Sequence, residues 1–435
     1  MAGALGTEAA VDQPRAREAA MLVVRHLRGQ GHEAYFAGGC VRDELLGLEP
    51  GDYDVATDAT PERLASLFHG ARLVGAKFGV VQVRKLGVWT EVATFRTDGS
   101  YTDKRRPDAV VFSDPQADAE RRDFTINALF LDPLAEQASW THRADGRAVA
   151  GRVIDLVGGL HDLEAGVLRA VGDPHRRLAE DQLRSLRAVR FAARLGFEIE
   201  PDTAHAIVEH AGQLESISRE RIGGELRRML SHESRARAAS LMEMLELDGP
   251  VLETRAAGAG RHHPRLAGLG GSADAMLALA AWVLDRGQGR EEGSILPTAS
   301  GLRAALCLSN DEHLRLKHTL QARVAVLERF SDLGKAGRKR LAASEGFGPA
   351  MSILRAEAPD LAAGVDGVVA ALAGEPGGLA PEPWVTGEDL IAAGLQPGPV
   401  FARVLEGLYD LQLERAVADR GALLEHLATL DVSKE

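Results

Sequence analysis

The first hundred residues show short stretches of helical and extended apolar patterning, separated by glycine and proline. The stretch EAAMLVVRHLRGQ (residues 18–30) has the apolar spacing of a helix, and GHEAYFAGG after it predicts a strand that ends in a glycine turn. A short helix, VRDELLGL, opens directly from Gly38 and Gly39 and stops before Pro50. Further strands are expected at 53–56, 79–84 and 89–96, with the helix PERLASLF between the first two. This pattern predicts a small mixed α/β unit.

From about residue 174 onward the apolar pattern is helical. It begins with the helix HRRLAEDQLRSLRAVRFAARLG and continues through TAHAIVEHAG and RERIGGELRRMLS. Two stretches rich in glycine, alanine or proline, 254–273 and 373–384, are expected to be loops or linkers. At 435 residues the chain is too long for one ordinary core, and domains of roughly 100 to 200 residues would make it two to four modules.

The composition is that of a folded protein outside the membrane. The chain is 45% hydrophobic and 26% charged, and no apolar run approaches the ~20 residues of a membrane span. The amino-terminal segment lacks a basic start followed by an apolar core, which predicts no export. Two cysteines, Cys40 and Cys307, cannot form a disulfide framework or a zinc site by themselves. We therefore expect a cytoplasmic protein.

The net charge of −12 counts against nucleic-acid binding, because phosphate contacts need a basic surface. However, only 7 of the 51 basic residues are lysine, and arginine is the side chain suited to bidentate phosphate and base-edge contacts. Genome composition accounts for the arginine content equally well. The charge balance alone leaves an RNA substrate open.

Three acidic residues could hold a divalent cation. Asp52 and Asp54 lie two apart in an expected strand and would project from one face, and Glu91 lies on a later strand. Two metal ions held by such carboxylates activate a hydroxyl and stabilise a leaving pyrophosphate. By itself a DxD sequence is more often a solvated turn. Its context is the turn Gly38-Gly39 before Arg42, where glycines that open a helix let backbone N–H groups approach a triphosphate.

Five segments, taken together, resemble the successive motifs of the class II tRNA nucleotidyltransferase and bacterial poly(A) polymerase family. In the family's order, they are GGCVRDELLG, DYDVATDATPERL, EVATFRTDGSYTDKRRPD, RRDFTINAL and EDQLRSLRAVRFAARLGF. These segments lie between residues 38 and 197, and the resemblance as a whole covers residues 36 to about 230. The resemblance implies an α+β fold in which a polymerase-beta-type nucleotidyltransferase head precedes all-α neck, body and tail domains. The corresponding bounds are 1–150, 151–240, 241–380 and 381–435.

The resemblance also implies roles for individual residues. Asp52 and Asp54 would be the metal ligands, and Glu91 would be the third catalytic carboxylate and a candidate to receive the proton of the attacking hydroxyl. Gly38, Gly39 and Arg42 fall in the triphosphate-binding segment. The RRDFTIN motif contacts the ribose and phosphates of the incoming nucleotide in the family and supplies Arg121, Arg122, Asp123 and Asn127 here.

The segment Glu180–Arg184 matches the family's base-recognition motif. An aspartate accepts a hydrogen bond from an exocyclic amine, whereas an arginine donates to ring nitrogen or carbonyl acceptors. At positions i and i+3 of a helix, Asp181 and Arg184 would share a face and imitate a Watson–Crick edge for cytosine and adenine. An ordinary helical ion pair is the alternative reading. Arg187, one turn further, is a further candidate for nucleotide contact.

Three other stretches bear on the substrate. Asp98–Pro107 resembles the family's flexible loop, which is associated with addition of the terminal A. Leu73–Val83 lacks both the GIKHGTV wording of many CCA-adding enzymes and the basic GRRF wording of enterobacterial poly(A) polymerases. Val385–Glu414 resembles the tail segment that meets the tRNA elbow, with Pro397-Gly398-Pro399 joining two short helices.

These features together predict an RNA 3′-end nucleotidyltransferase that adds CCA to tRNA from CTP and ATP, with Mg²⁺ as cofactor, two ions during catalysis, and with release of pyrophosphate. Alternatives with the same chemistry are an A-adding tRNA nucleotidyltransferase and a poly(A) polymerase. A catalytically silent RNA-binding relative is a different class, and it would be expected to have a damaged carboxylate set. The expected partner is the tRNA 3′ end, with no membrane and no protein partner.

Overall fold

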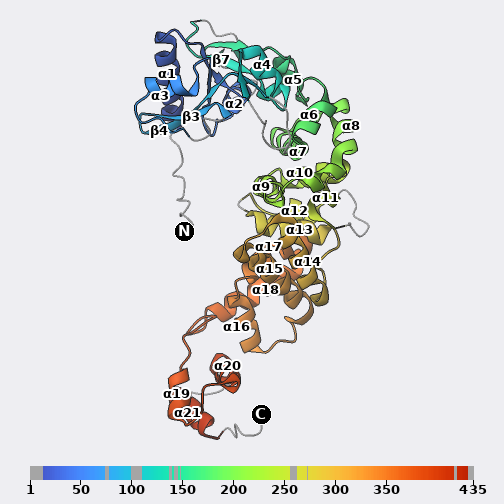
Figure 1. Cartoon of the computed structure of the whole chain (residues 1–435). Coiled ribbons are helices and arrows are strands. Elements are labelled where there is room, and N and C mark those ends of the chain that lie inside the picture. The colour runs from blue at the N-terminus through green and yellow to red at the C-terminus, as the bar shows by residue number, and fades with distance from the viewer. Residues whose placement is uncertain are drawn as a thin grey trace. The chain divides into compact units, whose positions relative to one another are not determined.

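The computed structural model describes residues 13–73, 78–98, 110–136, 140–141, 146, 148–254, 262–271, 273–415 and 419–429. The chain divides into two compact units, one of residues 1–221 with 245–250 and one of residues 222–244 with 251–435. The first unit contains the sheet, and the second is helical in its described part (Figure 1). The predicted division into four domains is finer than these units and stays a prediction.

A six-stranded mixed sheet forms the centre of the first unit, in the order β10-β7-β1-β2-β4-β3. Every neighbouring pair is antiparallel except β2 and β4, which run parallel with Val55 opposite Val92. The helix α1 packs on β1, β3 and β4 (Figure 1). The sheet strands are β1 (Ala34–Ala37), β2 (Val55–Thr57), β3 (Val80–Lys85), β4 (Val88–Thr94), β7 (Phe130–Asp132) and β10 (Arg152–Ile154).

Helices and short strand pairs surround this sheet. The helices of the first unit are α1 (Gln13–Gly29), α2 (Gly39–Leu46), α3 (Pro61–Leu67), α4 (Pro115–Glu120), α5 (Gly159–Ala165), α6 (Pro174–Glu180), α7 (Leu183–Leu195) and α8 (Pro201–His210). The strand pairs are β5 (Arg96–Asp98) with β6 (Val110–Phe112), β8 (Trp140–Thr141) with β9 (Ala148–Val149), and β11 (Val167–Leu168) with β12 (Glu198–Ile199). Side chains at the helix starts explain several boundaries, since Thr60 and Asp173 accept from the N–H groups of Arg63 and Arg176.

The expected helices and strands of the head are present, with two corrections. Asp52 and Asp54 do not lie in a strand, because β2 begins only at Val55. The predicted strand 89–96 ends at Thr94, and a new strand starts at Arg96. The first correction places Asp52 and Asp54 just before the paired backbone of β2, where their side chains need not follow the sheet's alternation. The second leaves the fully buried Phe95 between β4 and β5.

The prediction of one continuous helix around the base-recognition segment is also wrong, because the chain forms two helices there, α6 and α7. Asp181 has an extended backbone (φ −150°, ψ 107°) and ends α6. Its side chain accepts from the backbone N–H of Leu183, the first residue of α7, at 3.1 Å, and Gln182 between them is the N-cap of that helix. Asp181 and Arg184 therefore lie on either side of a helix break.

The second unit continues with helices to the carboxyl end of the described chain. They are α9 (Arg219–Leu230), α10 (Arg235–Met244), α11 (Asp248–Leu252), α12 (Pro264–Ala267), α13 (Ala275–Asp285), α14 (Glu292–Leu306), α15 (Asn310–Arg329), α16 (Lys335–Ala343), α17 (Phe347–Glu357), α18 (Pro359–Ala373), α19 (Gly387–Ala392), α20 (Pro399–Glu414) and α21 (Arg420–Thr429), where α9 and α11 contribute residues to both units. None of the helices in the described chain has the length and apolar character that a bilayer crossing requires.

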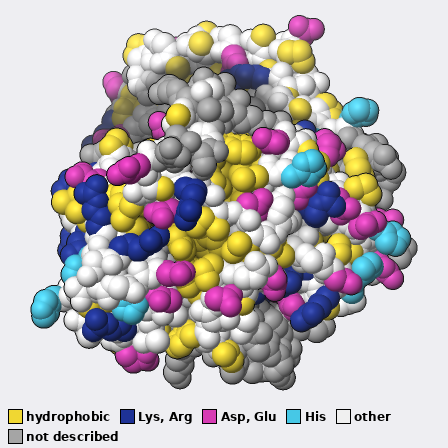
Figure 2. Space-filling view, turned by 90° about the horizontal axis from the view of Figure 1, so that it is seen from above, with side chains coloured by type: hydrophobic (Ala, Val, Ile, Leu, Met, Phe, Trp, Pro, Cys, Tyr) yellow, Lys and Arg dark blue, Asp and Glu magenta, His cyan; other side chains and the backbone are white. Residues whose placement is uncertain are grey.

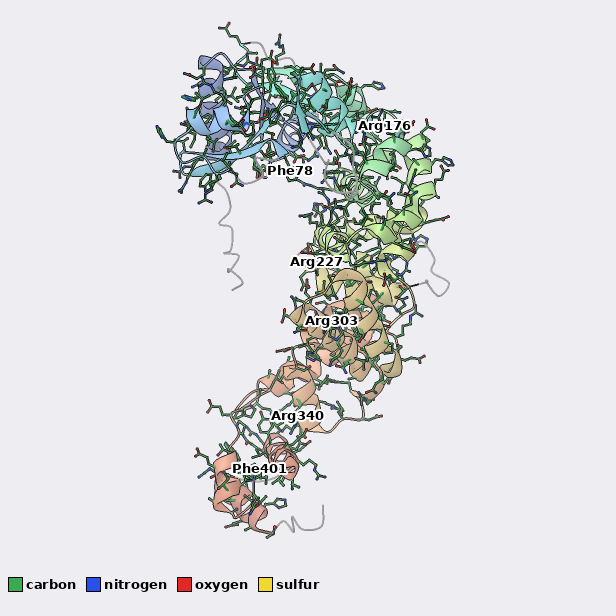
Figure 3. The ribbon with its side chains drawn as sticks, viewed as in Figure 1. Phe78, Arg176, Arg227, Arg303, Arg340 and Phe401 are labelled. Atoms are coloured by element: carbon green, nitrogen blue, oxygen red, sulfur yellow. The ribbon has the colours of Figure 1, made fainter. Side chains whose placement is uncertain are left out.

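Two apolar clusters hold the carboxyl-terminal helices. One contains Val326, Phe347, Leu354 and Val365, and the other contains residues 385–427 around Leu390 and Leu408. The expected loop at 373–384 lies between the two clusters. Arg340 on α16, labelled in Figure 3, donates to Asp410 of α20 at 2.6 Å.

The first expected linker is only partly a loop. Within 254–273 the helix α12 forms, and its Leu266 is fully buried. Arg265 on the same helix pairs with Asp285 at 3.0 Å. Tertiary packing therefore orders residues 264–267 as a helix although the surrounding sequence favours a loop.

Candidate functional site

A cavity of about 690 Å³ lies in the first unit and gathers most of the predicted site residues. Twelve of the thirteen line it, and the exception is Glu91. The lining residues predicted from the sequence are Gly38, Gly39, Arg42, Asp52, Asp54, Arg121, Arg122, Asp123, Asn127, Asp181, Arg184 and Arg187. The sequence segments that supply them lie up to 149 positions apart, from residue 38 to residue 187, so folding creates this arrangement.

The carboxylates lie where β2 and β4 begin to pair. Asp52 is exposed, Tyr53 is buried and Asp54 is half-buried, so the two aspartates avoid the core that Tyr53 enters. Because Val55 is opposite Val92 in the parallel pair, Glu91 is the residue of β4 beside Asp54. Burial, the charge of Asp52 and then that of Glu91 raise the pKa of Asp54 to about 7, although Arg122 opposes the shift. Asp54 thus responds to the charges of both other carboxylates.

The carboxylates at this place fit a magnesium ion that they would bind together with other ligands. Mg²⁺ is usually held by one or two carboxylates together with phosphate oxygens and water. Asp52 and Asp54 supply two carboxylates at the cavity wall. Within the described residues, no three His, Cys, Asp or Glu side chains form a complete ligand group by themselves. The remaining ligands of an ion at this place would be phosphate oxygens and water.

The glycine turn between β1 and α2 brings backbone close to the arginines. Gly38 has a φ of 78°, and a Cβ at this position would lie 2.8 Å from Nη1 of Arg122. Arg42 on α2 is only 3% exposed and donates to Asp43 and to Oδ1 of Asn127. Only glycine fits the turn without moving Arg122.

A buried aspartate that the sequence reading did not single out holds both arginines of the RRDFTIN segment. Asp118 is 1% exposed, and its two carboxylate oxygens accept from Arg121 at 2.6 Å and Arg122 at 2.9 Å. Although burial alone would raise the pKa of Asp118, the two guanidinium groups hold it below its ordinary value. The signal in the sequence is the spacing of three and four positions on one helical turn.

Asp123 makes a second buried pairing. Its side chain accepts from Asn127 at 3.0 Å, from the N–H of Phe124 at 2.9 Å and from Arg187 at 2.8 Å. Burial disfavours the ionised carboxylate, but Arg187 and Asn127 hold the pKa of Asp123 well below its ordinary value. Asp123 therefore aims Asn127 and Arg187 into the cavity, while its own lone pairs are largely used.

The base-recognition residues lie at the cavity but are not paired with each other. Arg184 donates to Glu180 at 2.7 Å, whereas Asp181 accepts from Arg221 at 2.7 Å. The alternative of an Asp181–Arg184 ion pair is therefore wrong. Each of the two side chains has its own partner and faces the same cavity.

The cavity is basic although the chain is acidic. Its lining includes eight arginines and five aspartates, which leaves a surplus of three positive charges. The lining also includes three arginines that were not among the predicted site residues, Arg190, Arg194 and Arg221. The guanidinium carbon of Arg190 lies 4.3 Å from the centre of the Phe191 ring. On the face shown in Figure 2, by contrast, acidic and basic side chains are interspersed.

Comparison with known proteins shows the family of the chain. Residues 34–169 match the Poly A polymerase head domain, and residues 196–252 match the family described as a probable RNA- and SrmB-binding site of polymerase A. The CCA-adding enzyme of Limosilactobacillus fermentum is 35% identical over 413 residues, which are 93% of this chain and 95% of that protein. This chain belongs to the CCA-adding enzyme family. The family resemblance expected from the five motifs is thus confirmed.

Other members of the CCA-adding enzyme family match as well. The CCA-adding enzyme of Leuconostoc mesenteroides is 43% identical over 236 residues, 53% of this chain and 55% of that protein, so that match spans about half of the relative's length. The crystal structure of the Bacillus stearothermophilus CCA-adding enzyme in complex with CTP has a TM-score of 0.73 at 28% identity and covers 96% of this chain and 98% of that one. The predicted fold class, a polymerase-beta-type head followed by helices, is confirmed.

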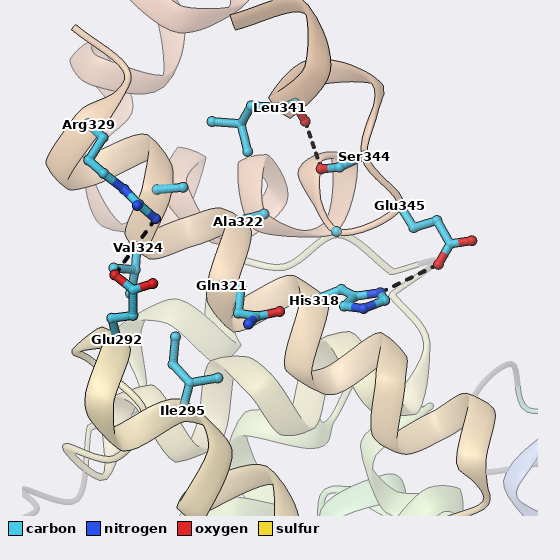
Figure 4. A pocket seen from close by; sticks show the side chains of 12 residues that line it. Glu292, Ile295, His318, Gln321, Ala322, Val324, Arg329, Leu341, Ser344 and Glu345 are labelled. Atoms are coloured by element: carbon cyan, nitrogen blue, oxygen red, sulfur yellow. Dashed lines mark hydrogen bonds and ion pairs between the residues drawn. The ribbon is translucent and has the colours of Figure 1, made fainter. Parts of the chain in front are cut away.

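A second cavity of about 490 Å³ lies in the second unit, among α14, α15, α16 and the residues that join α16 to α17 (Figure 4). Its wall includes the ion pair of Glu292 with Arg329 at 3.8 Å and a contact of Nδ1 of His318 with Glu345 at 3.5 Å. None of the residues predicted to be functional in this chain lines the second cavity. The flexible-loop residues 99–107, and residues 74–77 of the stretch that lacks the common family wording, lie outside the described residues.

Proposed function

We propose that this chain adds CCA to the 3′ end of tRNA, with transfer of CMP twice and AMP once from CTP and ATP and release of pyrophosphate. The observation that carries the proposal is that one cavity is lined by the glycine turn, two of the three carboxylates, the arginines and the base-recognition residues. The full-length match to a CCA-adding enzyme supports the same substrates. The proposed partner is therefore the tRNA 3′ end.

The arginines would bind the triphosphate. Arg121 and Arg122 are oriented by Asp118, and Arg42 by Asp43 and Asn127. Guanidinium groups match phosphate oxygens in pairs of hydrogen bonds. Because these arginines are already held by hydrogen bonds, their side chains lose little conformational freedom when the nucleotide binds, and this favours binding.

The transfer itself would be an in-line displacement at the α-phosphorus. The 3′-hydroxyl oxygen of the RNA forms the new P–O bond, the bond to the β-phosphate oxygen breaks, and pyrophosphate leaves. Glu91 would accept the hydroxyl proton. Asp52 and Asp54 would hold Mg²⁺, and when bound the ion supplies charge stabilisation to the phosphoryl oxygens.

Asp181 and Arg184 would select the base. A carboxylate accepts from the exocyclic amine of cytosine or adenine, while the arginine donates to acceptors beside it. Uracil and guanine carry a carbonyl in the place of that amine. Two acceptors facing each other leave a polar pair without a hydrogen bond, which disfavours both bases.

The helical parts would bind the rest of the tRNA. We propose a neck at 151–240, a body at 241–380 and a tail at 381–435 after a catalytic head at 1–150. The separate apolar clusters on either side of 373–384 support a boundary between body and tail. The tail prediction concerned Val385–Glu414, where α19 and α20 are joined through Pro397-Gly398-Pro399.

The alternative is an adenylyltransferase, either A-adding or poly(A)-forming, and the match to a Poly A polymerase head domain favours it as a second candidate. The deciding experiment uses tRNA ending before CCA, tRNA ending in CC and a generic RNA of similar length. Each is incubated with CTP, ATP or both, and the product ends are sequenced. Addition of CCA to the first RNA supports the proposal. Long A tails on generic RNA, or addition of A to the CC substrate alone, would refute it.

A further inference from the structure

Arg221 contacts the base-recognition segment from a distant part of the chain. It lies on α9, 40 positions from Asp181, and its Nη2 donates to Oδ2 of Asp181 at 2.7 Å. Both side chains are largely shielded, with 18% and 17% of their surface exposed, and both line the cavity. The interaction is therefore a directed pair inside the site rather than a surface ion pair.

The hydrogen bonds of Asp181 leave room for a base. Oδ1 accepts from the N–H of Leu183 at 3.1 Å, and Oδ2 accepts from Arg221. A carboxylate has about four acceptor positions, so each oxygen keeps one for an incoming donor. The two contacts fix the plane of the carboxylate, one from the start of α7 and one from α9. Arg221 thus holds the acceptor without using up its capacity.

Arg184 is fixed by different partners. Its Nη1 donates to Glu180 and to the carbonyl oxygen of Arg177, both at 2.7 Å, and its Nη2 reaches the carbonyl oxygen of Arg121 at 3.4 Å. These contacts use three of its five N–H groups. The acceptor and the donor of the base-recognition pair are consequently set by separate neighbours, and Arg221 acts on the acceptor alone.

We infer that Arg221 is a positioning residue for nucleotide selection, which holds the Asp181 carboxylate in register with Arg184. This inference rests on the proposed selection of cytosine and adenine by these two residues. Without Arg221 the carboxylate is held only by the N–H of Leu183 and can rotate away from the base edge. Both the affinity for CTP and the rejection of UTP then decline, because discrimination requires the acceptor to meet the exocyclic amine.

The test compares Arg221→Met, Arg221→Lys and Arg219→Met in the full chain. Arg219 lies on the same helix and donates to the carbonyl oxygen of Pro250 at 2.8 Å, so its variant removes a comparable side chain outside the cavity. Calorimetry measures the binding of CTP, ATP and UTP without RNA, and steady-state kinetics with tRNA separate KM from kcat. Thermal unfolding of each variant shows whether the fold is retained.

For Arg221→Met we expect the preference for CTP over UTP to fall by about tenfold, mainly through weaker CTP binding and a higher KM. Arg221→Lys restores the charge, so at least half of the lost preference on a logarithmic scale should return. Arg219→Met should keep the wild-type preference. The inference is overturned if Arg221→Met binds CTP and UTP like Arg219→Met, if lysine restores nothing, or if the wild type itself does not prefer CTP.

These outcomes are separable from those of the proposed function. A wild type that prefers CTP in calorimetry and depends on Arg221, but adds nothing to tRNA, supports the role of Arg221 and refutes CCA addition. A wild type that adds CCA while Arg221→Met keeps full preference supports CCA addition and refutes the role of Arg221.

Discussion

Replacement of Gly38 by alanine tests whether the turn before α2 sets the position of Arg122. Gly38 has φ 78° and ψ −128°, a conformation that costs a residue with a Cβ about 1–3 kcal/mol. The new Cβ would lie 2.8 Å from Nη1 of Arg122. Arg122 cannot yield freely, because it donates to Asp118 at 2.9 Å and to the carbonyl oxygen of Asn127 at 3.1 Å.

Loss of one of these bonds adds roughly 1–3 kcal/mol, since the bond involves charged groups. We therefore expect Gly38→Ala to destabilise the first unit by about 3 kcal/mol, or about 10 °C in its unfolding midpoint for a unit of this size. Displacement of Arg122 from the cavity should also lower kcat/KM for CTP by at least tenfold, or about 1.4 kcal/mol.

Differential scanning calorimetry and nucleotide addition to tRNA measure the two effects. Gly31→Ala is the matched control, because Gly31 also has a positive φ of 83° but no atom lies within 4 Å of its ideal Cβ. Gly31→Ala should have the backbone strain alone, which lowers the free energy of unfolding by about 1–2 kcal/mol, and it should keep full activity. If Gly38→Ala matches Gly31→Ala in both stability and activity, the idea that Gly38 makes room for Arg122 is wrong.

Three further predictions concern single carboxylates. Asp52→Asn should abolish every nucleotide addition while the unfolding midpoint stays within about 2 °C of wild type, because Asp52 is exposed and lines the cavity. Asp118→Asn should raise KM for CTP and ATP about tenfold in steady-state assays, because the buried carboxylate no longer holds Arg121 and Arg122. Glu357→Gln should reduce the loss of stability of the second unit between about pH 4.5 and pH 2.5, because it removes one carboxylate of lowered pKa, measured by denaturant unfolding from pH 7 to pH 2.5.

The sign of the Glu357 effect follows from its pKa. Burial would raise it, but Arg323 and Arg265 bind both carboxylate oxygens and lower the pKa from 4.5 to about 2. A carboxylate whose pKa is lower in the folded state stabilises the fold above its unfolded pKa, and this stabilisation disappears as pH falls from about 4.5 to 2. A pKa difference of about 2.5 corresponds to about 3 kcal/mol for this largely shielded group.

Each of these three predictions has a result that contradicts it. Retained addition by Asp52→Asn would overturn the assignment of the metal ligand. An unchanged KM in Asp118→Asn would mean that the arginines hold their places without the buried carboxylate. For Glu357→Gln the contradictory result is a pH profile that still falls between pH 4.5 and 2.5 with the wild-type slope. Glu345→Gln, at a side chain 85% exposed, is the control for loss of a carboxylate as such.

The sequence was sufficient for features that depend on neighbouring residues. The apolar spacing predicted α1, and the glycines around VRDELLGL predicted a short helix at α2. The sequence pattern could not predict the break between α6 and α7, because HRRLAEDQLRSL contains neither glycine nor proline. At the break the backbone of Asp181 is extended, and its side chain accepts hydrogen bonds from Leu183 and Arg221. Contacts across 40 positions are invisible to periodicity.

The net charge was the least informative property of the sequence. A total of −12 counts against a polyanionic substrate, yet the cavity wall carries eight arginines against five aspartates. These arginines come from four separate stretches of the chain: α2, the end of α4, α7 and α9. A substrate responds to the potential of the surface that it enters, and that potential depends on charges within about a Debye length, roughly 8–10 Å. An acidic chain can therefore offer a basic cavity to a triphosphate, while its other surfaces keep the excess of negative charge.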